Sequence, residues 1–221
     1  MNLNNLLGVV IGYLDLVKAY HDKPELVKKN AAAVEEAVLR IVSIIKQLST
    51  LVVKTRLPLI AGDLDNLINS GVQRYRTEYK IDGQVTVDNS LKNLAIDTHY
   101  EIFEEVLSKV LINAWEAYGD APTSQRPITI RTEVVEHPEE GRRLHVKVED
   151  QGRGIDADIR DHVFEPFVSS KQTVGVGMGL TVARHALRNL GGEVLLADRP
   201  GGGTIVTLIH PLDRKNRRAN S

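Results

Sequence analysis

The chain has 221 residues, and its 28 Lys and Arg against 29 Asp and Glu give a formal net charge of −1 at pH 7. This balance lacks the basic excess typical of nucleic-acid-binding proteins, so no nucleic-acid partner is expected. Cysteine is absent, which excludes disulfides, thiolate catalysis and cysteine-ligated zinc. The apolar, uncharged run at residues 6–14 is about half of the ~20 residues that a membrane-spanning helix needs. We therefore expect a cytoplasmic protein, without membrane contact by this part of the chain.

The first 55 residues predict two amphipathic helices joined by a short loop, which form an antiparallel hairpin. Residues 2–20 carry two adjoining apolar stripes, and residues 24–54 carry one unbroken apolar seam from Val27 to Val52. A lone hairpin leaves the second stripe in water, so we expect two chains to pair into a four-helix bundle. The second helix would be ~46 Å long and the first ~28 Å. This mismatch favours a natural first helix that begins before residue 1, and a genuinely short first helix is the alternative.

The periodicity changes after residue 57. Helices are predicted over residues 63–75, 98–118 and 179–190, with Asp97 or Thr98 capping the second of them. Strands are predicted over residues 84–88, 94–96, 128–135, 144–149, 193–197 and 204–209. The expected fold class is α+β: a helical hairpin at residues 1–56, a two-layer α/β sandwich at 57–212 and a solvated, basic tail at 213–221.

Three clusters could carry chemistry. The carboxylate of Asp150 follows a strand and stands beside two glycines, which let a flat ligand approach closely, although an ordinary Asx turn is the alternative. A glycine run, residues 175–179, precedes a helix whose free N–H groups could hold an anion, with a flexible loop as the alternative. Asn113 lies on an apolar helix face, where its amide oxygen could bind Mg²⁺ or could simply be satisfied in the core.

The order of these clusters, with Phe164-Glu165-Pro166-Phe167 before the glycine run, resembles the ATP-binding domain of sensor histidine kinases. That domain belongs to the wider family shared with gyrase, MutL and the heat-shock chaperone ATPases. The resemblance covers about residues 60–212. The segment Leu3-Asn4-Asn5-Leu6-Leu7 resembles the dimerisation and phosphoacceptor hairpin of the same kinases.

The resemblance implies ATP and Mg²⁺ as cofactors. Asp150 would accept the adenine amino group, Asn113 would hold Mg²⁺ against the phosphates, and residues 155–174 would form a lid anchored by Phe164 and Phe167. The other residues that it assigns to ATP lie against the base or the phosphates: Gly152, Gly154, Lys171, Gly175, Gly177, Gly179, Leu180 and Thr204.

Two parts of the sequence depart from the family's pattern. The acceptor motif has His, then Asp or Glu, then two residues, then Asn or Thr, and here Met1, Asn2 and Asn5 stand at those positions. Only Asn5 remains, at the position that helps to orient water when the regulator is dephosphorylated. Lys109 stands where these kinases often have Asn, and where the hydrolysing relatives have a Glu that acts as a base and activates water. Lysine cannot act as a carboxylate base, which argues against the chaperone, gyrase and MutL branch and bears on how Mg²⁺ is held.

The expected function is the catalytic core of a dimeric sensor histidine kinase of a two-component system. It would transfer the γ-phosphate of ATP to a histidine, whose place Met1 takes here, and relay it to the receiver domain of a response regulator. The alternative is a non-catalytic pseudokinase or phosphatase scaffold that docks a response regulator. A protein-serine kinase or anti-sigma ATPase is disfavoured by the N-terminal hairpin.

Overall fold

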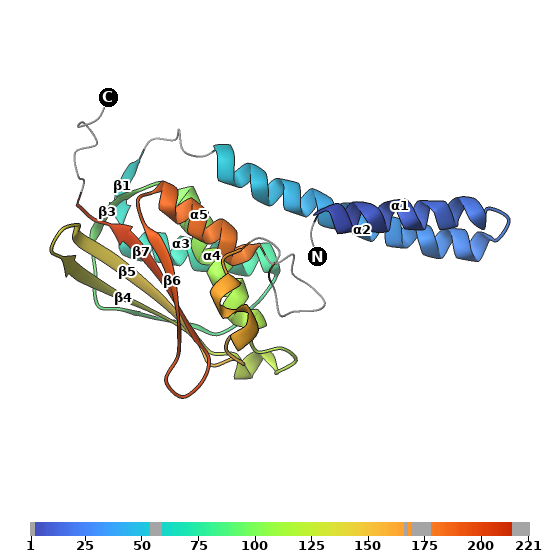
Figure 1. Cartoon of the computed structure of the whole chain (residues 1–221). Coiled ribbons are helices and arrows are strands. Elements are labelled where there is room, and N and C mark those ends of the chain that lie inside the picture. Colours follow the sequence, from blue (N-terminus) through green and yellow to red (C-terminus); the bar gives the residue numbers. More distant parts are fainter. Residues whose placement is uncertain (1–2, 54–58, 166–167, 169–177, 214–221) are drawn as a thin grey trace, which may run out of the picture.

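A helical hairpin extends from an α/β unit in the computed structural model, which describes residues 3–53, 59–165, 168 and 178–213 (Figure 1). Helices α1 (Leu3–Ala19) and α2 (Pro24–Val53) pack against each other, as predicted. The seam on α2 is divided between two environments. Val27, Val34 and Ile41 are half-buried, whereas Val38 and Ile45 are 41% and 55% exposed. The hairpin therefore uses only part of its apolar surface internally.

The α/β unit is built on a five-stranded sheet in the order β2-β4-β5-β7-β6. Its strands are β2 (Val85–Asn89), β4 (Ile128–His137), β5 (Gly141–Asp150), β6 (Glu193–Asp198) and β7 (Thr204–Pro211). Strand β2 runs parallel to β4, and the other neighbours are antiparallel. Every second residue is buried along β7, along β5 from Leu144 and along β4 as far as Thr132, which is the alternation of a sheet covered on one face.

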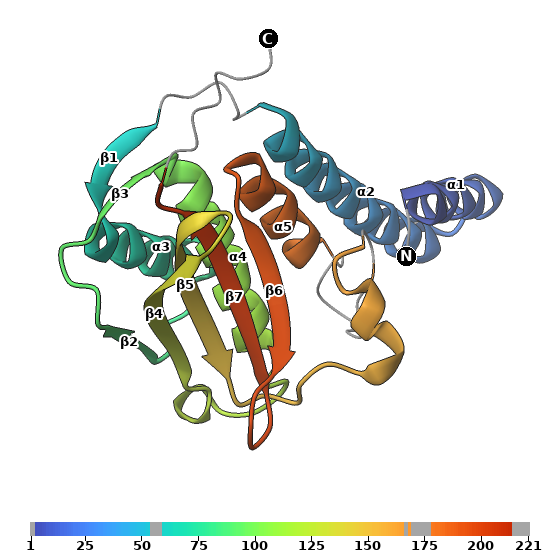
Figure 2. The same ribbon diagram turned by 60° about the vertical axis from the view of Figure 1, so that its left-hand side comes forward.

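Helices α3 (Leu64–Tyr79), α4 (Tyr100–Glu116) and α5 (Gly179–Asn189) cover that face, with α4 packed between the other two (Figure 2). The core lies between the two layers, where Phe103, Leu107 and Leu111 of α4 meet buried strand residues such as Ile130 and Val146. The predicted two-layer sandwich is confirmed. Helix α2 also contacts α5, so the hairpin and the sandwich meet at this helix.

A second, two-stranded sheet pairs β1 (Ile60–Asp63) with β3 (Ala95–Thr98). The sequence did not predict β1. Because β1 pairs with β3, the predicted cap of α4 is also wrong. Asp97 and Thr98 pair with Ala61 and Ile60, so they remain in β3, and His99 takes the N-cap position without a side-chain cap bond. Two short 3₁₀ helices, η2 (Thr123–Gln125) and η3 (Ala157–His162), complete the described elements.

The chain end differs from the expected tail at one residue. The Asp213 carboxylate accepts hydrogen bonds from the Arg142 backbone N–H at 2.8 Å and from its guanidinium, so Asp213 belongs to the folded unit. Residues 214–221 lie outside the described part. None of the helices in the described ranges has the length and the apolar character needed to cross a bilayer.

Candidate functional site

The site centres on Asp150, the last residue of β5, whose side chain is only 3% exposed. Its Oδ1 accepts hydrogen bonds from the backbone N–H of Gly152 at 2.8 Å and of Thr204 at 3.3 Å. The first bond is an Asx turn, as the alternative interpretation proposed. The second comes from β7, 54 positions away, and ties the carboxylate to the neighbouring strand. The fold thus brings Asp150, Gly152 and Thr204 together.

Glycines let the backbone on either side of Asp150 pack closely against neighbouring elements. A Cβ on Gly152 would lie 2.6 Å from both the Cβ and the carbonyl oxygen of Ala117. A Cβ on Gly203 would lie 2.1 Å from the Asp150 carbonyl oxygen, and Gly203 has a φ of +94°, which L residues rarely adopt. Gly203 was not among the predicted site residues, although the run of three glycines before Thr204 signals a special backbone there.

The C-terminal end of α4 is bonded to the same loop. The Ala117 carbonyl accepts from the Arg153 N–H at 3.0 Å, and the Tyr118 hydroxyl accepts from the Gln151 N–H at 2.7 Å. That hydroxyl also donates to the carbonyl of Pro127. Burial raises the pKa of Tyr118, so its phenol stays protonated. Sequence reasoning missed this tyrosine, because nothing local to residue 118 indicates a partner 33 positions away.

Asn113 lies one turn before Ala117 on the same helix, and its carbonyl accepts from the Ala117 N–H at 3.1 Å. Lys109 is one turn further back, with its Nζ 3.9 Å from Glu105 Oε1. Both side chains of this ion pair are largely buried, at 11% and 12% exposed. The lysine charge therefore faces a carboxylate of its own helix, and the Lys109 Cα lies one turn before Asn113.

An arginine of α5 contacts Phe164, one of the two predicted anchors of the lid at residues 155–174. The Arg184 guanidinium lies over the Phe164 ring at 4.4 Å, and Arg184 and Arg188 both donate to the Glu193 carboxylate at 2.8 Å. Burial alone would raise the pKa of Glu193, but the hydrogen bonds from these arginines outweigh it and lower the pKa. Phe167 lies outside the described residues.

The glycine run is described only at its end. Gly179 and Leu180 open α5, and Met178 at the N-cap makes no side-chain cap bond. The first turn of α5 thus keeps backbone N–H groups that its own cap does not use. Lys171, Gly175 and Gly177 lie outside the described residues, as does Met1, while Asn5 is exposed on α1.

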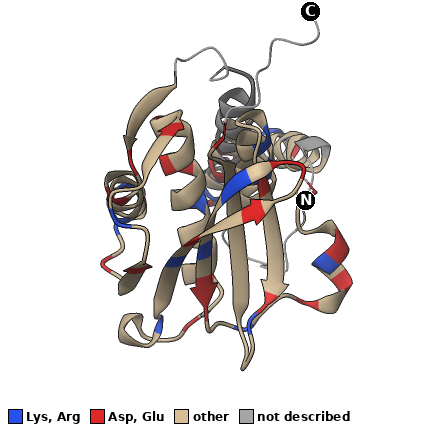
Figure 3. Cartoon of the chain, turned by 90° about the vertical axis from the view of Figure 1, so that its left-hand side faces the viewer, with Lys and Arg blue, Asp and Glu red and all other residues tan. Residues whose placement is uncertain are grey.

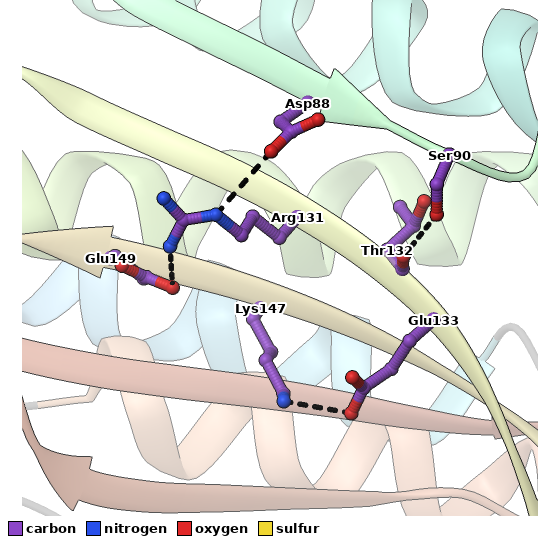
Figure 4. Close-up of a pocket in the computed structure, with 7 residues that line it drawn as sticks. All are labelled: Asp88, Ser90, Arg131, Thr132, Glu133, Lys147 and Glu149. Atoms are coloured by element: carbon purple, nitrogen blue, oxygen red, sulfur yellow. Dashed lines mark hydrogen bonds and ion pairs between the residues drawn. The ribbon is translucent and has the colours of Figure 1, made fainter.

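A separate pocket of about 340 Å³ lies on the sheet face away from the helices (Figure 4). Its charges are paired internally: Arg131 with Asp88 and Glu149, and Lys147 with Glu133 at 2.7 Å. Figure 3 shows acidic and basic residues interspersed over this face. The three carboxylates and two cations that line this pocket pair with one another, and none of the predicted site residues lines it.

Comparison with known proteins defines the class. Residues 98–214 match the family described as histidine kinase-, DNA gyrase B- and HSP90-like ATPases, and the chain belongs to this family. Within it, the chain is similar to sensor histidine kinases. It is 28% identical to DcuS of Escherichia coli K12 over 96% of this chain and 35% of DcuS, and 29% identical to ZraS of the same organism over 79% of this chain and 36% of ZraS. The chain thus spans about a third of the length of these relatives.

Solved structures share the arrangement of hairpin and sandwich. Histidine kinase AdeS of Acinetobacter baumannii aligns with a TM-score of 0.59 at 20% identity, over 96% of this chain and 98% of that one. Histidine kinase ThkA, solved in complex with response regulator protein TrrA, aligns with a TM-score of 0.66 at 20% identity, over 95% of this chain and 58% of that one. At this identity the likeness shows the fold, which is a helical hairpin followed by an ATPase-type α/β sandwich.

Proposed function

We propose that this chain is the ATP-binding catalytic core of a sensor histidine kinase of a two-component system. The observation that carries the proposal is the buried Asp150 carboxylate, oriented by the amides of Gly152 and Thr204 beside the end of α4. A buried carboxylate with fixed N–H donors is a directional acceptor, which suits the amino group of adenine. The family match over residues 98–214 and the similarity to DcuS support it.

In this proposal different residues contact the base and the phosphates of the nucleotide. Gly152 packs against Ala117 and Gly154 has a φ of +75°, so the loop that they form brings its backbone close to the base. Thr204 lies behind the base. The N-terminal turn of α5, at Gly179 and Leu180, directs backbone N–H groups toward the phosphates. Lys171, Gly175 and Gly177 keep the phosphate-binding roles that the sequence predicts for them.

Asn113 suits a metal site to which the protein contributes few ligands. Within the described ranges no cluster of three His, Asp or Glu side chains is placed to hold a metal ion, so the protein would contribute an amide oxygen and the phosphates the remaining ligands. Bound Mg²⁺ would neutralise charge that develops on the phosphates during transfer. The chain's own part is to orient the nucleotide through Asp150 and to hold its phosphates at the start of α5.

We further propose a homodimer through the hairpin and docking of a response regulator receiver domain, as the complex of ThkA with TrrA suggests. Apolar side chains that a single hairpin leaves in water support the homodimer: Leu7, Ile11, Leu14, Leu16, Leu39, Val42 and Ile45. The alternative is a non-catalytic pseudokinase or phosphatase scaffold, and the observation that favours it is the Lys109–Glu105 ion pair on the helix that carries Asn113.

Calorimetry with Mg·ATP and Mg·ADP tests nucleotide binding. We expect micromolar affinity for the wild type and a loss of ~10- to 100-fold in Asp150→Asn, because a hydrogen bond to a charged group contributes ~1.5–3 kcal/mol. Asparagine keeps an oxygen for the two amides, so the loop should survive. The control is Asp88→Asn, at a carboxylate 66% exposed in the outer pocket, which should bind like the wild type. No heat at millimolar nucleotide would refute the proposal.

A second experiment separates kinase from scaffold. The chain is mixed with Mg·ATP and a longer homologous hairpin that carries the acceptor histidine. Acid-labile phosphate on that hairpin supports a competent catalytic domain. An unlabelled hairpin, in a mixture where calorimetry shows bound nucleotide, favours the scaffold.

A further inference from the structure

Tyr118 stands outside the roles described so far, yet it is bonded to the centre of the site. Its hydroxyl accepts from the Gln151 N–H at 2.7 Å and donates to the Pro127 carbonyl. It follows directly after Ala117, whose carbonyl accepts from the Arg153 N–H at 3.0 Å. The end of α4 therefore holds the loop on both sides of Gly152.

The Gln151 N–H belongs to the peptide plane that also contains the Asp150 carbonyl. Because a peptide unit is planar, holding its N–H fixes the direction of its carbonyl and with it the backbone from which the Asp150 side chain departs. The opposite edge of the plane meets Gly203, where a Cβ would come within 2.1 Å of the Asp150 oxygen. The plane is thus held between a hydroxyl on one edge and a glycine on the other.

We propose that Tyr118 is a positioning residue that sets the preference of this site for a purine carrying a 6-amino group. It acts through the 150–151 peptide plane, which aims the Asp150 carboxylate at that amino group. This inference rests on the proposed nucleotide-binding function and assigns it a determinant of base selectivity. Phenylalanine at this position keeps the ring but releases the Gln151 N–H, which lies where water can replace the hydroxyl. The substitution should therefore disturb the orientation of the Asp150 carboxylate more than the stability of the fold.

The test compares Tyr118→Phe with Tyr100→Phe. The Tyr100 hydroxyl also donates to a backbone carbonyl, that of Asp63 at 3.2 Å, but at the opposite end of α4. Tyr118→Phe loses the two hydrogen bonds of its hydroxyl and Tyr100→Phe loses one, so both melting temperatures should fall, and that of Tyr118→Phe further. Affinities are measured for ATP and for inosine triphosphate, which has the same phosphates and lacks the amino group.

Tyr118→Phe should bind ATP ~3- to 10-fold more weakly, as expected for one misplaced hydrogen bond, and inosine triphosphate as tightly as the wild type does. Tyr100→Phe should leave both affinities unchanged. In an Asp150→Asn background, Tyr118→Phe should have no further effect on ATP. Equal losses for the two nucleotides, or an unchanged ATP affinity, would overturn the positioning role while leaving the nucleotide site intact. A wild-type chain that binds neither nucleotide would instead overturn the proposed function, and this inference with it.

Discussion

Alanine at Gly203 should damage the site far more than alanine at its neighbour Gly202. Both glycines have positive φ, +94° and +102°, so both substitutions place an L residue in a strained conformation that costs ~1–2 kcal/mol. Stiffening of the unfolded chain offsets ~0.4–1 kcal/mol of this. At Gly202 nothing lies within 4 Å of the new Cβ, and the net loss should be about 1 kcal/mol.

At Gly203 the new Cβ would also stand 2.1 Å from the Asp150 carbonyl oxygen and 2.7 Å from the Gln151 Cα. Both atoms are backbone, so the loop must move, at a further ~1–3 kcal/mol. Gly203→Ala should therefore lose about 2–4 kcal/mol, or roughly 5–15 °C in melting temperature. Because the displaced atoms carry Asp150, affinity for ATP should fall at least about tenfold, as for one charged hydrogen bond lost.

Urea unfolding and calorimetry on the wild type and both variants measure these effects. Gly202→Ala serves as the matched control for backbone strain, and its ATP affinity should equal that of the wild type. Equal stability losses in the two variants would show that the strands do not approach as closely as the structure indicates. An unchanged ATP affinity in Gly203→Ala would refute the link between this approach and Asp150.

Three other perturbations are informative. Burial lowers the pKa of His210 to about 4 from an unfolded value of 6.5, so the unfolded chain binds the proton more readily between these values. Stability should be full above about pH 6.5 and fall by up to ~3 kcal/mol as the pH drops to 4, and urea unfolding of His210→Leu should lack this part of the pH dependence. Lys109→Asn removes a cation from the helix that carries the proposed metal ligand Asn113. The ratio of the ATP affinity with Mg²⁺ to that with EDTA should therefore rise about fivefold in calorimetric titrations. An unchanged ratio contradicts this reasoning. Leu39→Glu, at a side chain 62% exposed on α2, should dissociate the proposed dimer in sedimentation, whereas Leu195→Glu, 50% exposed on the sheet, should not.

The sequence was sufficient to predict those parts of the fold that repeat regularly. The hairpin and the strands on either side of Asp150 follow from spacings within one element, and the structure has them near the predicted bounds. Strand β1 has four residues, too few for a period-2 pattern to register, and one of them is Gly62. Its pairing with β3 then took Asp97 and Thr98 away from the helix cap, which local preference alone could not anticipate.

Within the site, sequence reasoning selected residues that are unusual where they stand. Asp150 beside glycines and Asn113 on an apolar face are conspicuous in the chain itself. Tyr118 and Gly203 are ordinary by that standard, and their importance arises only from partners brought together by folding. The α2 seam is a related case, because the sequence shows that Val38 is apolar but not whether α1 or another molecule covers it.

One helix serves both ends of the proposed nucleotide site. Asn113 and Ala117 are four positions apart at the end of α4, so the spacing between the proposed metal position and the loop after Asp150 is set by about one helical turn, ~6 Å. Helices resist stretching but transmit rotation, and a single residue inserted between these two would turn one end by about 100° relative to the other. Substitutions that keep α4 helical therefore preserve this spacing, whereas an insertion or deletion of one residue between Asn113 and Ala117 would misalign the two ends of the proposed site.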